Sequence, residues 1–227
     1  MIRIEGVEKG YRKKGGTYVP ILSIPHLRFG EGETVSLVGP SGCGKTTFLH
    51  LVSGILLPEK GRVFFRDQDL TKLSERGRDR FRARHIGYVH QTFNLLPPFS
   101  ALENVILGAF FAGRSGRATR DAARALLERV GLSDRMENRP GELSVGQQQR
   151  VALARAMINA PELILADEPL GSQDPETGQA VLELLLELVR ESGATLLMVT
   201  HDHRTAEILD RRVDMREFAL GMGEPAR

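Results

Sequence analysis

The chain has 227 residues, of which 41% are hydrophobic and 26% are charged, so it is long and apolar enough to bury one full core. Its formal net charge of +2 is too small for a protein that coats nucleic acid with a basic surface. No apolar run reaches the roughly 18 residues that a membrane-spanning helix needs, and the longest candidate, residues 105–113, is half that length. One domain with an inserted subdomain is therefore expected.

The N-terminal part of the chain has the pattern of β structure. Residues 1–38 and 61–66 contain short alternating strand patterns that are broken by glycine and proline. Residues 1–5 already read as a strand and lack the apolar stretch of a signal peptide. We therefore expect a soluble cytoplasmic protein, and the single cysteine, Cys43, is compatible with a reducing compartment.

A phosphate-binding loop follows the first of these regions. Residues 39–46 read Gly-Pro-Ser-Gly-Cys-Gly-Lys-Thr and match the motif G-x-x-x-x-G-K-[ST]. A strand pattern at 34–38 precedes the loop and a helical pattern at 47–52 follows it, which is the context that the motif requires. The glycines let backbone N–H groups approach phosphate oxygens, and the helix N-terminus points its positive dipole end at them. The residues predicted to contact a nucleotide are Gly39, Pro40, Ser41, Gly42, Cys43, Gly44, Lys45, Thr46 and Thr47.

Two side chains of this loop carry specific chemistry. Lys45 supplies a compact positive charge for the β- and γ-phosphates, and the Thr46 hydroxyl is placed to ligate Mg²⁺. A nucleoside triphosphate is therefore the first ligand to consider, and the flanking elements disfavour the alternative of a glycine-rich turn without a ligand. Cys43 cannot form an internal disulfide, and we interpret it as a small filler of the loop in preference to a nucleophile.

The middle of the chain is first charged and then helical. Residues 70–84 carry many arginines around few apolar positions, which predicts a solvated helix or loop; a basic binding site is the alternative. Residues 102–130 have a helical pattern, with a flexible turn expected at 113–116. The expected apolar face of this helical region comprises Ala122, Ala123, Ala125, Leu126, Leu127 and Val130.

The last third of the chain returns to buried strands. Strand patterns at 163–166 and 195–199 flank a helical pattern at 177–190. Strands that alternate with helices imply a parallel sheet. Two adjacent carboxylates, Asp167 and Glu168, follow the first of these strands.

These two carboxylates are candidates for metal binding and proton transfer. An acidic group at the carboxyl end of a strand, where an α/β sheet collects its ligands, can hold Mg²⁺, and we assign Asp167 to this role. Glu168 points differently along the chain and could accept a proton from an attacking water. The alternative is that both are solvent-facing loop residues, which the phosphate loop in the same chain disfavours.

Residues 143–150 read Leu-Ser-Val-Gly-Gln-Gln-Gln-Arg, and they resemble the signature motif of ATP-binding-cassette (ABC) ATPases. They lie between the phosphate loop and the acidic strand, which is the order of that family. Other family elements match as well, and the resemblance covers nearly the whole chain. Tyr11 resembles the aromatic residue that stacks on adenine, Gln91 the Q-loop glutamine, Asp174 the D-loop aspartate and His201 the switch histidine.

The resemblance implies a fold and its division. The fold would be an α/β P-loop NTPase of ABC type, with a mainly parallel sheet core, an N-terminal antiparallel β subdomain and an inserted helical subdomain. Residues 1–227 would form a single ABC ATPase domain. Within it, residues 1–91 and 158–227 would form the nucleotide-binding core with the β subdomain, and residues 92–157 the helical subdomain with the signature motif.

The resemblance also implies an enzyme that binds ATP and Mg²⁺ and hydrolyses ATP. Two copies would close head to tail as a homodimer, each signature motif capping the nucleotide held by the opposite phosphate loop. The implied catalytic residues are Lys45, Gln91, Glu168 and His201, and the implied metal ligands are Thr46, Gln91 and Asp167. Tyr11, Ser144, Gly146, Gln147 and Asp174 would join the phosphate loop as nucleotide-binding residues.

Four of these residues have an ordinary structural interpretation when each is taken alone. Ser144 could be a simple helix N-cap, and His201 could be a structural histidine after a strand. Gln91 could be a surface residue, and Tyr11 could be a partly buried packing residue. The order and completeness of the motifs favour the functional interpretation for all four.

The chain departs from the family pattern in two places at the expected dimer interface. Val145 stands where the signature usually has glycine, and a β-branched residue would be strained there if the position required a positive φ. If the side chain points away, little changes. Residues 170–173 read Leu-Gly-Ser-Gln before Asp174, where related exporters commonly carry Thr-Gly-Asn-Leu. We expect these changes to bear on catalytic rate and dimer closure and to leave nucleotide binding intact.

Residues 93–97, 102–105 and 166–169 resemble the subgroup that powers lipoprotein release, macrolide export and related envelope systems. Members couple ATP-driven closure to permeases with few transmembrane helices and a large extracytoplasmic domain. The implied partners are integral membrane permease subunits, with no nucleic acid, and the chain would lie at the inner face of the cell membrane through the permease alone. Four residues are expected to form an apolar groove for a coupling helix or, equally, to belong to the core: Phe93, Leu95, Leu96 and Phe99.

Two other functions stay as alternatives. One is the ATPase of a mechanotransmission complex, which would regulate a cell-wall hydrolase through a membrane protein and move no substrate; its motifs would look alike. The other is a soluble ABC-type ATPase that acts on nucleic acid or ribosomes. It is disfavoured because the chain has one cassette, no long coiled-coil insertion and no basic tail. The sequence favours the ATPase subunit of a transporter.

Overall fold

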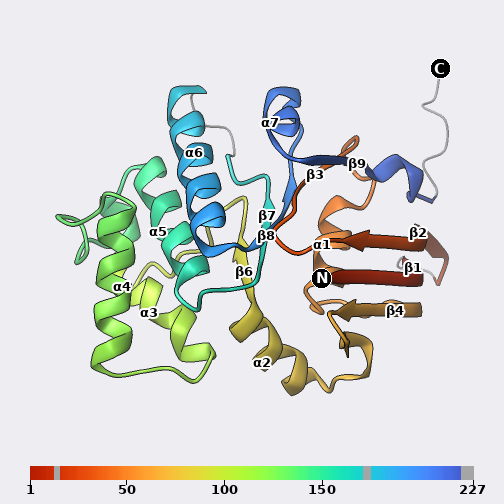
Figure 1. The fold of residues 1–227 in the computed structure, drawn as a ribbon, viewed down its shortest axis with the longest axis horizontal. Coiled ribbons are helices and arrows are strands. Elements are labelled where there is room, and N and C mark those ends of the chain that lie inside the picture. Colours follow the sequence, from red (N-terminus) through yellow and green to blue (C-terminus); the bar gives the residue numbers. More distant parts are fainter. Residues whose placement is uncertain (13–15, 171–174, 221–227) are drawn as a thin grey trace. The chain divides into compact units, whose positions relative to one another are not determined.

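The computed structural model describes residues 1–12, 16–170 and 175–220. The chain forms two compact units (Figure 1). The first unit comprises residues 1–78 together with the C-terminal part from residue 197, and the second comprises residues 79–196. The boundary between the two units falls within helix α2 (Glu75–His85) and again within strand β8 (Thr195–Val199).

An antiparallel sheet forms the β-rich part of the first unit. Its strand order is β2-β1-β4-β5, and Figure 1 shows β2, β1 and β4 side by side. Apolar side chains such as Ile2 and Ile4 alternate with more exposed ones along β1, so one face of the sheet is buried. The predicted antiparallel β subdomain is therefore confirmed. The strands are β1 (Ile2–Arg12), β2 (Tyr18–Phe29), β4 (Lys60–Phe65) and β5 (Gln68–Asp69), and the short helix η1 (Leu70–Lys72) follows them.

The first unit also contains a pair of parallel strands that positions the phosphate loop. Strand β3 (Thr34–Val38) pairs in parallel with β9 (Arg211–Asp214), and four of its five residues are buried, as expected of a parallel strand. Helix α1 (Lys45–Val52) begins where the loop after β3 ends. Helix α7 (His203–Ile208) packs on β3, and the short helix η3 (Met215–Glu217) follows β9. Phe48 of α1 meets Phe29 edge to face at 6.1 Å, which anchors α1 in the core.

The second unit combines parallel strands with a group of helices. Strand β6 (Ile86–Val89) pairs in parallel with β7 (Leu163–Asp167). The helices α3, α4 and α5 pack on one another (Figure 1). Fully buried side chains, among them Ala109, Leu127 and Leu153, fill the space between these helices. The helices are α3 (Ala101–Phe111), α4 (Arg117–Arg129), α5 (Val145–Met157) and α6 (Pro175–Ser192), with the short helix η2 (Pro140–Glu142) before α5.

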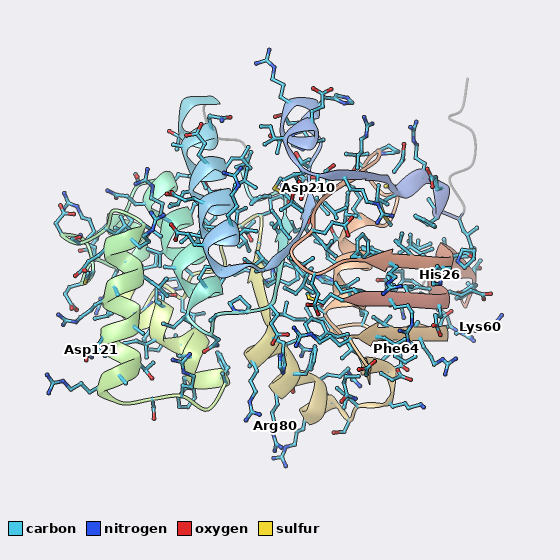
Figure 2. All side chains as sticks on the ribbon, viewed as in Figure 1. His26, Lys60, Phe64, Arg80, Asp121 and Asp210 are labelled. Atoms are coloured by element: carbon cyan, nitrogen blue, oxygen red, sulfur yellow. The ribbon has the colours of Figure 1, made fainter. Side chains whose placement is uncertain are left out.

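Most elements expected from the sequence are present, and their details differ in instructive ways. The charged stretch forms α2, which buries none of its residues, and Figure 2 shows the side chain of Arg80 extending away from it. The turn at 113–116 separates α3 from α4. The expected apolar face was wrong for Ala125, which is exposed, because buried Ala123 and Leu127 are one turn apart and place Ala125 on the other side of the helix.

Candidate functional site

The phosphate loop lies between β3 and α1 in a conformation that only its glycines can adopt. Gly39, Gly42 and Gly44 have φ values of 147°, 80° and 93°, in the region that L side chains rarely adopt. A Cβ at Gly44 would also lie 2.8 Å from a methyl carbon of Leu22. The glycines of the motif therefore serve the backbone path as well as the approach of a ligand.

Lys45 is held inside its own loop. It is 8% exposed, and its ammonium donates hydrogen bonds to the carbonyl oxygens of Gly39 at 2.8 Å and Pro40 at 2.9 Å. The long side chain thus folds back over the loop and presents its charge where the loop curves. A phosphate oxygen bound there would share or replace these carbonyls as the acceptor of the Lys45 N–H groups.

Cys43 fills the interior of the loop. Its side chain is 1% exposed, and a Cβ at Gly39 would lie 2.7 Å from its Sγ. A nucleophile needs access to its substrate, so this burial agrees with the interpretation of Cys43 as a small filler.

The start of α1 offers backbone donors to an anion. Its N-cap is Gly44, which provides no side-chain cap, so the first N–H groups of the helix are open to an acceptor from outside. Thr46, the predicted metal ligand, is exposed in the first turn. The hydroxyl of the next residue, Thr47, lies 3.4 Å from the hydroxyl of Tyr11.

Tyr11 stands beside this helix as a half-exposed aromatic side chain. It lies near the end of β1, its ring is 44% exposed, and the Lys9 ammonium lies 5.6 Å from the ring centroid. This exposure is compatible with the alternative interpretation of Tyr11 as a partly buried packing residue and also leaves part of its ring accessible to a ligand. A flat, accessible π-face close to the phosphate loop suits a nucleobase.

His201 and the phosphate loop line one pocket of the first unit. The pocket has a volume of about 210 Å³, and Gly39, Pro40 and His201 contribute to its wall. Asp202 caps α7 with its carboxylate, and the hydrogen bond from the Thr205 hydroxyl holds the pKa of Asp202 below its ordinary value. The structure therefore places the predicted switch histidine beside the predicted phosphate site. The complete lining is Val38, Gly39, Pro40, Thr200, His201, Asp202, His203, Arg212, Asp214 and Arg216.

In the second unit the structure brings Gln91 and Glu168 together. The Gln91 Nε2 donates a hydrogen bond to the Glu168 Oε2 at 3.2 Å, across 77 positions of sequence. Asp167 is the last residue of β7, and Glu168 has a φ of 45°, in the left-handed region. Such a conformation is unfavourable for a residue with a side chain, and it turns Glu168 away from the strand. The backbone therefore leaves the strand conformation at Glu168, directly after Asp167.

Sequence reasoning missed Tyr88, which lies near Asp167. Its hydroxyl oxygen is buried, and burial, together with the charge of Asp167, raises the pKa of Tyr88. The ring stacks on His90 at 4.1 Å, just before Gln91. The parallel register pairs Tyr88 with Leu165, two residues before Asp167, so the side chains of Tyr88 and Asp167 share one face. A tyrosine in an otherwise apolar strand was the signal available in the sequence.

The signature motif forms the N-terminus of α5. Ser144 is the N-cap: its hydroxyl accepts a hydrogen bond from the Gln147 N–H at 3.3 Å, while the Gln147 Oε1 accepts one from the Ser144 N–H at 2.9 Å. Ser144 therefore has the structural role that was its alternative interpretation. Its hydroxyl proton is still able to point outward, so the capping role and a ligand contact are compatible.

Val145 fits the signature without strain. It is the first residue of α5, it is not among the residues with positive φ, and its side chain is 54% exposed. Gly146 is the more constrained position, because a Cβ there would lie 2.9 Å from the Cγ2 of Thr177. Asp174 and residues 171–173 before it lie outside the described residues.

Within the described ranges, no helix combines the length and apolarity needed to cross a membrane.

The ABC transporter family model matches residues 22–171, about two thirds of the chain. The lipoprotein-releasing system ATP-binding protein LolD of Shewanella oneidensis is 40% identical over all of this chain and 98% of the relative. A second such protein, LolD 2 of Caulobacter vibrioides, is 42% identical over 97% of this chain and 96% of the relative.

Solved structures agree with this similarity. The chain matches the ATP-binding cassette MJ0796, in a dimeric post-hydrolysis state bound to ADP and Pi, with a TM-score of 0.86 and 38% identity over 94% of each chain. It also matches cbiO1 of Clostridium perfringens, part of the ABC transporter complex cbiONQ, with a TM-score of 0.80 and 27% identity over 94% of this chain and 83% of the other. The chain belongs to the ABC transporter family, in which it is an ATP-binding and ATP-hydrolysing subunit of a transporter.

Proposed function

We propose that this ATPase drives a membrane permease of the lipoprotein-release type and that it works as a head-to-tail homodimer. The full-length similarity to lipoprotein-releasing ATP-binding proteins supports the class of transporter, and the dimeric cassette MJ0796 supports the dimer. In this proposal the chain lies at the inner face of the cell membrane through its permease. The subdomain bounds expected from the sequence, with a helical subdomain at residues 92–157, are part of the proposal.

The exposed N-terminus of α5 is the structural observation that best supports the proposed dimer. Ser144 and Val145 are exposed, and Gly146 next to them is half-buried. A helix N-terminus with an exposed hydroxyl can bind the γ-phosphate of a nucleotide held by a second copy. Gln147 supports this end by completing the cap of Ser144, and Asp174 is proposed to act at the same interface.

The donors assigned to Mg²⁺ fit that ion chemically. Thr46 in the first unit offers a hydroxyl oxygen, whereas Gln91 and Asp167 in the second offer an amide oxygen and a carboxylate oxygen. All three are hard oxygen donors of the kind that Mg²⁺ prefers, and the ion usually keeps waters and phosphate oxygens as its other ligands. A bound Mg²⁺ would neutralise charge on the phosphate oxygens.

Glu168 is proposed as the general base. Its carboxylate accepts a proton from the attacking water while the water oxygen bonds to the γ-phosphorus and the bond to ADP breaks. Gln91 orients the carboxylate through the 3.2 Å hydrogen bond, and His201 is proposed to donate to the same phosphate. Lys45 and the loop N–H groups hold the phosphates in place, and Tyr11 stacks on the base.

The segment after Gln91 is proposed to receive the permease. Leu96 and Phe99 are 43% and 37% exposed, and Phe93 and Leu95 are half-buried, so none of the four belongs to the buried core. Two further aromatic side chains are exposed at the end of α3: Phe110 at 62% and Phe111 at 68%. Exposed apolar side chains in this number are typical of a surface that a partner covers.

The proposed dimer is tested by size-exclusion chromatography of the Glu168→Gln variant. With Mg·ATP we expect a dimer, because bound nucleotide that is not hydrolysed holds both copies together, and without nucleotide a monomer. Wild-type hydrolysis should rise more steeply than linearly with protein concentration. A variant that binds ATP and stays monomeric at all concentrations would contradict a dimer formed by the ATPase subunits alone.

We expect Val145→Gly to change the rate of ATP hydrolysis by less than about threefold, because Val145 needs no positive φ and its side chain points to solvent. Gly146→Val is the matched contrast. Its side chain would collide with Thr177 and displace the start of α5, and we expect at least a roughly tenfold loss. Steady-state rates of both variants decide between these outcomes, and a large gain in Val145→Gly would show that Val145 obstructs closure.

A further inference from the structure

The segment that follows Gln91 adopts a conformation that its own residues disfavour. Phe93 and Asn94 are consecutive non-glycine residues with φ values of 57° and 48°. Local bonds support the turn: the Phe93 N–H donates to the His90 carbonyl at 3.1 Å, and the Thr92 hydroxyl donates to the Asn94 Oδ1 at 2.9 Å. Two left-handed residues in a row persist only where the surrounding structure holds them.

Arg155 provides that hold from α5. Its Nη1 donates to the Asn94 carbonyl at 2.7 Å and its Nη2 donates to the Phe93 carbonyl at 2.5 Å, so both left-handed peptide groups are bound by one planar guanidinium. In the part of the chain that the structure describes, Arg155 forms no ion pair with a carboxylate, and burial lowers its pKa. The half-buried guanidinium of Arg155 therefore donates its hydrogen bonds to two main-chain carbonyl oxygens.

A second side chain fixes the far end of the same segment. Asn104 of α3 is fully buried, and its Nδ2 donates to the carbonyls of Leu96, Phe99 and Ser100 at 3.0–3.2 Å. Its Oδ1 accepts from the Leu96 N–H at 2.8 Å. The segment between Gln91 and α3 is therefore tied to α5 at one end and to α3 at the other, and these two helices pack together (Figure 1).

We propose that Arg155 is a positioning residue that connects Gln91 to the signature end of α5. Both ends of the connection belong to the second unit: the Arg155 contacts lie two and three residues after Gln91, and Arg155 and the Ser144 N-cap belong to the same helix. A helix moves as a rigid element, so a displacement of the segment is passed to Ser144 and Gly146. This inference rests on the roles proposed for Gln91 and for the signature residues.

The first test replaces Arg155 with lysine, which keeps the charge and loses the fork that spans two carbonyls. We expect kcat for ATP hydrolysis to fall about five- to tenfold, with KM for ATP within about twofold of wild type. Arg78→Lys is the matched control, because Arg78 also donates to two main-chain carbonyls, those of Gly54 and Leu73, at 3.0 Å and 2.7 Å. We expect this control to keep kcat within about twofold.

The second test asks whether the left-handed turn is what Arg155 holds. Glycine adopts a positive φ without penalty, so Asn94→Gly in the Arg155→Lys background should restore at least about half of the lost kcat. Asn94→Val with Arg155 intact disfavours the turn directly and should lower kcat by a similar factor. Thermal unfolding of every variant accompanies the rates, so that a loss of folded protein is separated from a loss of turnover.

Two results would overturn the proposal: a kcat for Arg155→Lys equal to that of Arg78→Lys, or no recovery with Asn94→Gly. Because these comparisons use ratios of turnover among variants that retain Glu168, they do not depend on its assignment as the base. A failure of that assignment would appear separately, as undiminished hydrolysis by Glu168→Gln.

Discussion

Replacing Glu168 with glutamine lowers the rate of ATP hydrolysis about 100-fold or more, and ATP affinity stays within about threefold of wild type. The carboxamide has nearly the same shape as the carboxylate but cannot accept the proton of the attacking water. Its oxygen can still accept the hydrogen bond from the Gln91 Nε2, so the local structure is kept. Single-turnover hydrolysis and equilibrium binding of ATP measure the two quantities separately.

The chain offers a matched control for this substitution. Glu183 on α6 also accepts a hydrogen bond from a glutamine, the Gln179 Nε2 at 2.8 Å, and this pair is exposed. Glu183→Gln therefore makes the same chemical change at a similar pair, and it should leave hydrolysis unchanged. If Glu168→Gln hydrolysed ATP at the rate of Glu183→Gln, another group or solvent would have to accept the proton.

Replacing Lys45 with alanine weakens ATP binding about 100-fold. The ammonium is the charged donor of the phosphate loop, and each hydrogen bond to a charged group contributes about 1.5–3 kcal/mol, so two bonds to the β- and γ-phosphates at the lower end of this range account for the factor. Equilibrium titration with a fluorescent ATP analogue measures the affinity. The shift of the unfolding temperature at saturating ATP gives an independent measure, because ATP raises this temperature only when it binds the folded chain.

Lys72→Ala is the control for the loss of one lysine charge. Lys72 is largely exposed, and its ammonium lies 3.8 Å from the buried Asp69 carboxylate, which is too far for a hydrogen bond. We expect its affinity for ATP to equal that of wild type. Lys45→Ala also loses two internal bonds to Gly39 and Pro40, so its unfolding without ATP must be compared with that of wild type. Unchanged ATP affinity in Lys45→Ala would remove this lysine from the phosphate site.

The sequence was most informative where chemistry restricts the residue types. Gly44 and Lys45 could be assigned because a phosphate loop needs backbone without Cβ atoms and a charge at fixed spacing, and the structure shows both features. The strand before Asp167 was readable from its continuous apolar run. The parallel sheet followed from strands that alternate with helices, whereas the antiparallel β subdomain was implied by the family resemblance.

The rest depended on contacts between distant parts of the chain. Strands β6 and β9 have four residues each, too few for a periodic pattern to show. Arg155 donates hydrogen bonds to carbonyls 61 and 62 positions away in the sequence. A local sequence pattern cannot predict such a bond, because every residue has a main-chain carbonyl oxygen. Tyr88 gained its place beside Asp167 only through the register of two strands. Val145 was ambiguous until the helix start fixed its backbone conformation.

The burial of Cys43 also makes the phosphate loop observable in solution. The chain has one cysteine, and its thiol is covered by the loop, so a thiol reagent can reach it only when the loop opens. The rate at which the thiol is labelled then reports either how fast the phosphate loop opens or what fraction of the loop is open at equilibrium. A nucleotide that rests on the loop slows labelling in proportion to its occupancy, and the reaction reports on the empty and filled loop without any substitution.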